Sequence, residues 1–76
     1  MPLTLANQNE VKIIQRIGGT DEVKHHLKNL GFVAGSYVTL ITKYNGNVIV
    51  SIKDARVALS EALARKIIVR GENIWH

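Results

Sequence analysis

The sequence of 76 residues contains no cysteine, and this absence excludes disulfides, thiolate zinc sites, iron–sulfur ligation and cysteine nucleophiles. It has one proline, and aromatic side chains make up 5% of it, too few and too scattered to indicate a surface on which nucleic-acid bases stack. No run approaches the ~18 consecutive apolar residues that a membrane span needs. Residues 1–10 lack the basic and apolar regions of a signal peptide. We therefore expect a soluble, unsecreted cytoplasmic protein with no direct membrane insertion.

The composition is that of an ordered globular domain, with 46% hydrophobic and 21% charged residues. A chain this short buries roughly 60% of its unfolded surface, so we expect a thin core and no large substrate cleft. The net charge of +4 favours anionic partners. However, the ten Lys and Arg residues are spread from Lys12 to Arg70, and Arg65 and Lys66 are the one adjacent pair. The charge therefore indicates either a solvated surface or a diffuse electrostatic footprint.

A short amphipathic helix is predicted from Val23 to about Leu30. Val23, Leu27 and Leu30 fall at i, i+4 and i+7, on one helical face, so we expect the helix to pack through Leu27 and Leu30. Thr20 or Asp21 can cap its amino end by accepting a hydrogen bond from a free amide of the first turn.

Two glycines are predicted to turn the chain after this helix. Gly31 suits the left-handed residue that closes a helix, and Phe32 then folds back onto Leu27 in a Schellman-type stop. Gly35 marks a second turn. A ligand-binding loop is the alternative interpretation, but no Gly-Lys-Ser/Thr follows, so the spacing is not that of a phosphate loop.

The remaining chain alternates in the manner of β-strands. We expect an extended start over residues 2–5 and strands over residues 11–17, 37–43, 48–52, 56–59 and 67–69. Asn45-Gly46 between two of these runs is a strong hairpin signal, and Lys53-Asp54 forms a second turn. Ser60 can cap a brief helix whose apolar side is predicted to be Ala62 and Leu63, with an ion pair from Glu61 to Arg65.

These elements predict a mostly β fold with one to two short helices. Val48, Val50 and Ile52 alternate with more polar neighbours, so we expect them to face the core. Several short strands around one inserted helix are typical of a small β-barrel, whose closure protects its edges. We place one barrel of about five strands in residues 1–70, followed by a polar tail in residues 71–76.

The order of these features resembles the FeoA family. The resemblance runs from about Leu3 to Val69 and is carried by Leu27-x-x-Leu30-Gly31-Phe32-x-x-Gly35-x-x-Val38, the Asn-Gly hairpin, Val57-Ala58-Leu59 and Ala64-x-x-Ile67-x-Val69. It implies an SH3-like barrel, a fold that also occurs as a C-terminal domain in metal-dependent repressors of the DtxR type. It further implies a small cytoplasmic partner of the FeoB ferrous iron transporter, acting as a regulatory or adaptor domain.

The exposed side of the first helix is the predicted contact surface for such a transporter's cytoplasmic domain. Lys24, His25 and Lys28 are expected to lie on this solvent-facing side. If they act electrostatically, binding weakens as salt rises.

A divalent transition metal, zinc or ferrous iron, is the one cofactor that the residues suggest. His25 with Asp21 or Glu22, one turn earlier, can form a two-ligand surface site. His25 and His26 project about 100° apart on a helix, so this adjacent pair does not chelate one ion. The alternative is that these histidines are exposed and bind nothing.

No catalytic arrangement stands out, and we expect no enzyme. The chain has six acidic residues and no evident Ser/His/Asp order or paired buried carboxylates. Three hypotheses follow: an adaptor of ferrous iron transport, a nucleic-acid-binding small barrel, and a metal sensor in which ferrous ion biases partner binding. The sequence specifies no oligomeric state.

Overall fold

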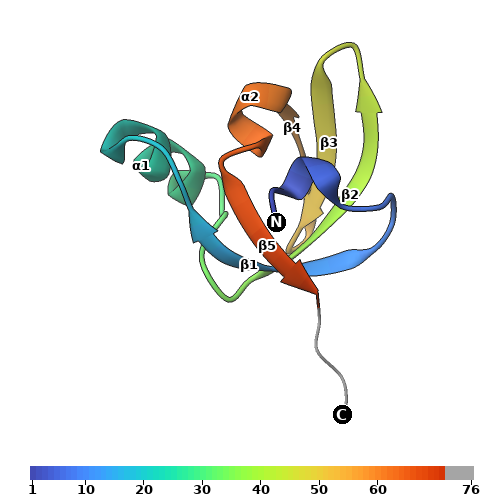
Figure 1. The fold of residues 1–76 in the computed structure, drawn as a ribbon, viewed down its shortest axis with the longest axis horizontal. Helices are drawn as coiled ribbons and strands as arrows, with labels where there is room; N and C mark the ends of the chain where they lie inside the picture. Colours follow the sequence, from blue (N-terminus) through green and yellow to red (C-terminus); the bar gives the residue numbers. More distant parts are fainter. Residues whose placement is uncertain (72–76) are drawn as a thin grey trace.

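Five antiparallel strands and two short helices form the part of the chain that the computed structural model describes, residues 1–71. In chain order the elements are η1 (Leu3–Leu5), β1 (Val11–Ile17), α1 (Asp21–Asn29), β2 (Tyr37–Tyr44), β3 (Asn47–Ile52), β4 (Ala55–Ser60), α2 (Glu61–Ala64) and β5 (Ile67–Gly71). The strands pair in the order β4-β3-β2-β1-β5, and α1 projects from one side of the sheet (Figure 1). The predicted fold class is confirmed.

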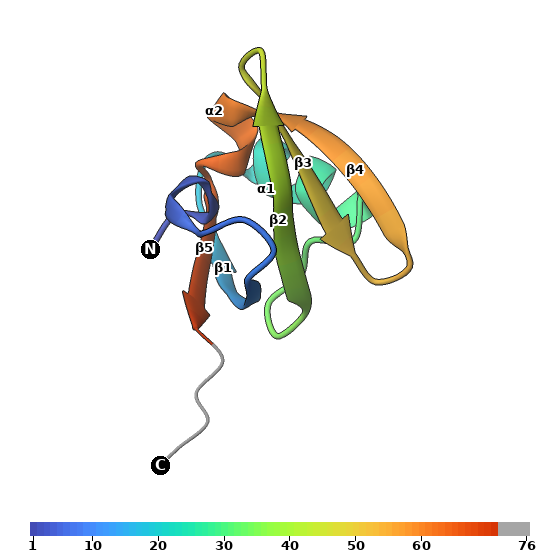
Figure 2. The same ribbon diagram turned by 90° about the vertical axis from the view of Figure 1, so that its right-hand side faces the viewer.

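The sheet curls on itself because two of its pairings shift register. The shifts lie between Ile14 and Arg16 in β1 and between Leu40 and Thr42 in β2, and such bulges bend and twist a strand. Figure 2 shows β4 and β5 on opposite sides of the resulting barrel. The buried side chains in residues 1–71 are all apolar: Leu3, Ala6, Ile14, Leu27, Phe32, Val38, Leu40, Val48, Val50, Ile52, Leu59, Ala64, Ile67 and Val69.

The predicted hairpin is confirmed, and its geometry explains the two residues that form it. Asn45 has φ 50° and Gly46 has φ 77°, the positive values that a type I′ turn requires at both central positions. The turn sets Tyr44 opposite Asn47. It thereby points Val48 and Val50 into the core, as expected.

The structure corrects one local prediction fully and another in part, since Leu63 does pack against the core as expected. Residues 2–5 are not extended, because the amide of Leu5 donates to the carbonyl of Pro2 at 3.0 Å and forms a 3₁₀ turn. The turn buries Leu3 completely. On α2 the buried side chain is Ala64, whereas Ala62 is exposed. Four residues make about one turn, so the approach of this helix to the core decides which side chain is covered.

The last strand includes the first residue of the predicted tail. β5 extends to Gly71, which pairs with Lys12, so the first residue of the predicted tail belongs to the sheet. Residues 72–76 lie outside the described part of the chain.

Candidate functional site

Hydrogen bonds at both ends of α1 fix where the helix begins and where it ends. Thr20 accepts a hydrogen bond at its Oγ1 from the amide of Val23 at 3.2 Å, which selects it over Asp21 as the N-cap. At the other end the amide of Phe32 donates to the carbonyl of Leu27 at 3.0 Å, and the amide of Gly31 donates to the carbonyl of Lys28 at 2.9 Å. These two bonds define the Schellman stop that was predicted.

One side chain fixes α1 to the barrel. Leu27 is fully buried, and Val23 is half-buried against the core. Leu30, which was also predicted to pack, is 37% exposed. The prediction was wrong because the reversal at Gly31 brings Phe32, which is fully buried, under the end of the helix. Leu30 therefore lies at the rim of the contact between α1 and the barrel.

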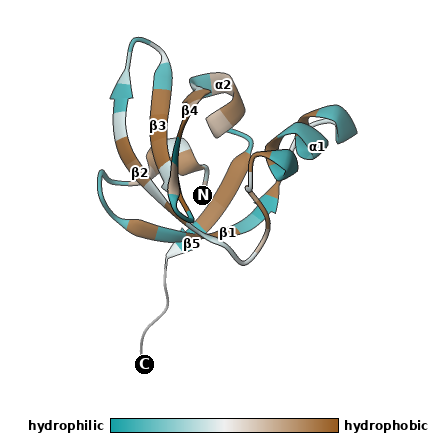
Figure 3. Ribbon diagram, turned by 180° about the vertical axis from the view of Figure 1, so that it is seen from behind, coloured by the Kyte–Doolittle hydropathy of each residue, from teal (hydrophilic) through white to brown (hydrophobic). Residues whose placement is uncertain are grey.

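The predicted site residues all lie on the exposed part of α1, where Figure 3 shows mostly hydrophilic residues. These residues are Asp21, Glu22, Lys24, His25 and Lys28. The acidic pair lies in the first turn, and Lys28 lies in the last. Each charge therefore complements the nearer end of the helix dipole.

A shallow hollow of about 290 Å³ lies between α1 and α2. Val23 and Leu63 supply its apolar walls, and Glu22 and His26, one helical turn apart, supply its polar lining. Leu63 was predicted to face the core, and it both packs against the core and borders this hollow. Sequence reasoning missed the hollow, since only the i, i+4 spacing of Glu22 and His26 pointed to it.

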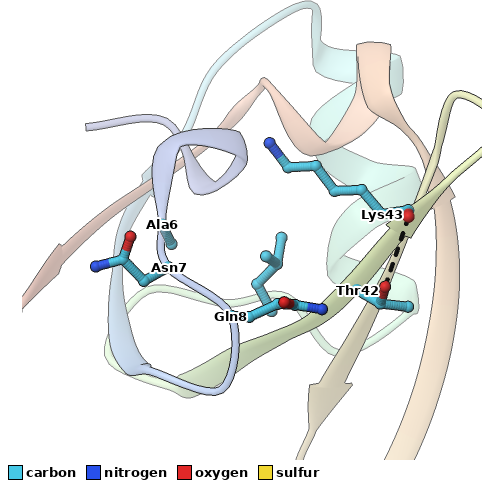
Figure 4. Close-up of a pocket in the computed structure, with 6 residues that line it drawn as sticks. Ala6, Asn7, Gln8, Thr42 and Lys43 are labelled. Carbon is cyan, nitrogen blue, oxygen red and sulfur yellow. Dashed lines mark hydrogen bonds between the residues drawn. The ribbon is translucent and has the colours of Figure 1, made fainter.

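A second hollow, of about 340 Å³, separates the amino-terminal arm, residues 1–10, from β2 (Figure 4). Two hydrogen bonds beside this hollow hold the arm against β2. Gln8 Nε2 donates to the carbonyl of Ile41 at 2.8 Å, and Lys43 Nζ donates to the carbonyl of Thr4 at 2.6 Å. Nearby, Lys12 Nζ lies 2.7 Å from Glu10 Oε1, and its hydrogen bond lowers the pKa of Glu10. The polar side chains of this region mainly hold the arm in place.

The part of the chain seen in the structure, residues 1–71, contains no group of three or more His, Cys, Asp or Glu side chains placed to hold a metal ion. His25 and Asp21 are one turn apart and both exposed, as a two-ligand surface site requires. Metal binding at Asp21, Glu22 and His25 stays a prediction. Neither α1 nor α2 has the length and apolarity to cross a membrane.

The fold is a five-stranded antiparallel barrel with one helix between its first two strands and another before its last, and it is of the SH3-like class of small barrels. A FeoA domain family model matches residues 1–71. "Putative Fe(2+) transport protein A" of Methanocaldococcus jannaschii is 34% identical over 77 aligned positions. The match covers 95% of this chain and 94% of that protein. The chain belongs to the FeoA family.

Solved structures share this fold at lower sequence identity. An iron uptake regulatory protein, FeoA, superimposes with a TM-score of 0.84 at 22% identity, covering 92% of this chain and 95% of that one. The FeoA of Stenotrophomonas maltophilia, described as complexed with zinc, gives 0.80 at 22% identity, covering 92% and 89%. A manganese-dependent transcriptional repressor gives 0.86 at 19% identity, covering 95% of this chain but 41% of that one.

Proposed function

We propose that this chain is a cytoplasmic accessory protein of ferrous iron transport, which binds the cytoplasmic domain of a FeoB-type transporter and acts by binding rather than catalysis. Membership of the FeoA family supports the link to transport. So does the name of the archaeal relative. The observation that carries the proposal is the arrangement of α1, which buries one side chain fully and leaves its charged side free.

The contact surface in this proposal is the exposed side of α1 that carries Lys24, His25 and Lys28. Lys24 and Lys28 are one turn apart, so their ammonium groups form a short basic strip for an acidic region of the partner. The hollow lined by Glu22, Val23, His26 and Leu63 opens on the other flank of α1, because His26 is two residues from each lysine and points about 160° away around the helix. The strip is therefore the part of α1 that this proposal assigns to the partner.

Reversing both charges of the strip is expected to weaken binding of the transporter's cytoplasmic domain about tenfold, because like charges then face the partner. The double variant Lys24→Glu/Lys28→Glu is titrated by calorimetry at low and at physiological salt. The matched control, Arg16→Glu/Arg70→Glu, makes the same change in net charge on exposed positions of β1 and β5 and should bind normally. Equal losses in the two variants, or no binding by the unaltered chain at high micromolar concentration, would contradict the proposal.

The metal prediction at the start of α1 has its own test. The two exposed ligands His25 and Asp21 are expected to bind zinc weakly, since protein zinc sites ordinarily use at least three side chains. Titrating zinc should shift the ring signals of His25 in NMR spectra only at a large excess of metal. His25→Ala removes this shift, whereas the neighbouring His26→Ala leaves it. Unchanged spectra, or tight stoichiometric binding, would count against the two-ligand site.

The alternative of a nucleic-acid-binding barrel gains no support from the three aromatic side chains in residues 1–71. Phe32 is fully buried and unable to stack on a base, whereas Tyr37 and Tyr44 are exposed at opposite ends of β2. A stacking platform needs neighbouring aromatic rings. We therefore retain the adaptor role as the proposed function.

A further inference from the structure

The two edges of the sheet differ in how they are covered. Along β5, the amino group of Met1 donates to the carbonyl of Val69 at 2.9 Å, and the amide of Val69 donates to the carbonyl of Met1 at 2.7 Å. Pro2 forms an adjacent bridge to Ile68. Met1 and Pro2 therefore occupy the β5 edge, and Met1 satisfies the outward N–H and C=O groups of Val69.

No segment within residues 1–71 covers the β4 edge in this way. A two-residue turn joins β3 to β4 and makes Ile52 and Ala55 a hydrogen-bonded pair. Because these pairs alternate along an antiparallel ladder, Val57 bonds back to β3, whereas Arg56 and Ala58 direct their N–H and C=O groups away from the sheet. Within residues 1–71 the backbone of Arg56 and Ala58 makes no hydrogen bond to any other segment. β4 is the outermost strand on its side in Figure 2.

We propose that the free edge of β4 receives an extended acidic strand from a partner protein, which pairs with the backbone of Arg56 and Ala58. A row of unpaired N–H and C=O groups is a template for an added strand. Lys53 and Arg56 are exposed beside it and favour acidic side chains. Asp54 opposes them in the turn, whereas Glu61 is already paired with Arg65 at 3.8 Å.

The burial pattern of β4 indicates the side-chain order of this strand. Val57 is half-buried and packs against the core from the edge strand, so an apolar side chain opposite it extends the core. Arg56 and Ala58 lie on the outer face and are exposed. An incoming strand that alternates acidic and apolar residues matches both faces.

A second copy of the chain fits this edge less well. Head-to-tail pairing of β4 with the β5 edge is blocked, because Met1 and Pro2 occupy that edge. Symmetric pairing of two β4 strands adds the positive charges of Lys53 and Arg56 from both copies along one seam, which is unfavourable. A foreign acidic strand avoids both costs.

The proposal is tested with the full chain and a short capped peptide in which glutamate and valine alternate. Two-dimensional NMR should show shifts centred on the amides of Arg56 and Ala58, with slower hydrogen exchange at both. A control peptide alternating lysine and valine should bind at least tenfold more weakly. Shifts confined to α1, or equal binding of the two peptides, would overturn the proposal. Concentration-dependent shifts at β4 without peptide would also overturn it and assign the edge to a second copy.

Two changes separate backbone pairing from charge alone. Ala58→Pro removes an outward N–H but no bond to β3, and it should reduce affinity for the acidic peptide at least tenfold. N-methylation of the peptide on alternate residues tests the same bonds without altering the chain. One methylation register should abolish binding, and the other should preserve it. Equal behaviour of the two registers would rule out strand pairing, whatever the fate of the α1 surface proposed to bind the transporter.

Discussion

Replacing Phe32 with alanine is expected to destabilise the fold by about 3–5 kcal/mol, the usual cost of removing a buried aromatic ring. Phe32 is fully buried, and it heads the fully buried side chains by volume. Small domains have about 5–15 kcal/mol of stability in total, so the variant should retain little of it. The core here is thin, and no disulfide compensates for the loss.

Urea denaturation followed by circular dichroism measures this loss as a fall in the transition midpoint. The control is Phe32→Leu, which keeps most of the volume and should cost under about 1.5 kcal/mol. Both variants keep the backbone hydrogen bond from residue 32 to the carbonyl of Leu27. The difference between them therefore isolates ring packing from the helix stop. Similar losses in the two would show that the ring is not the main contribution.

The parts of the fold that the sequence predicts well depend on short-range interactions. The Asn45-Gly46 turn needs only the backbone preferences of two residues. The cap at Ser60, whose Oγ accepts from the amide of Leu63 at 3.2 Å, is similarly local. Such signals also place the ends of α1 to within a residue or two.

The errors concern packing between segments that are distant in the chain. Leu3 enters the core through a 3₁₀ turn, and its arm is held by a hydrogen bond from Lys43 to Thr4, 39 positions apart. Ala64 rather than Ala62 is buried because of how α2 meets the barrel. Sequence periodicity does not carry this information, because four residues of helix span about one turn.

The same division applies to the candidate site. The exposure of Lys24 and Lys28 follows from the periodicity of one helix and was predicted correctly. The hollow on the other flank of α1 requires Leu63 of α2 to lie close to Val23, across some forty residues of chain. The open edge of β4 likewise emerges only from the strand order, because the sequence does not specify which of the five strands lie at the edges of the sheet. The exposed side of one helix follows from its own sequence period, whereas a surface that depends on how elements are arranged in space does not.

Leu27 and Leu30 offer a direct test of how α1 is attached. Leu27→Ala is expected to cost about 2–5 kcal/mol because it opens a cavity at a fully buried position. Leu30→Ala should cost about 0.5 kcal/mol or less, since this side chain lies at the rim. The two variants remove the same atoms, at one position inside α1 and at one position at its C-cap, and the large difference in burial dominates the comparison. Urea midpoints give the two losses.

Amide hydrogen exchange extends the comparison from stability to the proposed surface. Leu27 is the one fully buried side chain of α1, so its loss should raise exchange in the helix more than in the sheet. The α1 surface would then lose its fixed geometry, and transporter binding should fall even under conditions where the barrel remains folded. Leu30→Ala should leave exchange and binding unchanged. Equal destabilisation by the two substitutions would mean that α1 packs through both leucines, as its sequence spacing alone had predicted.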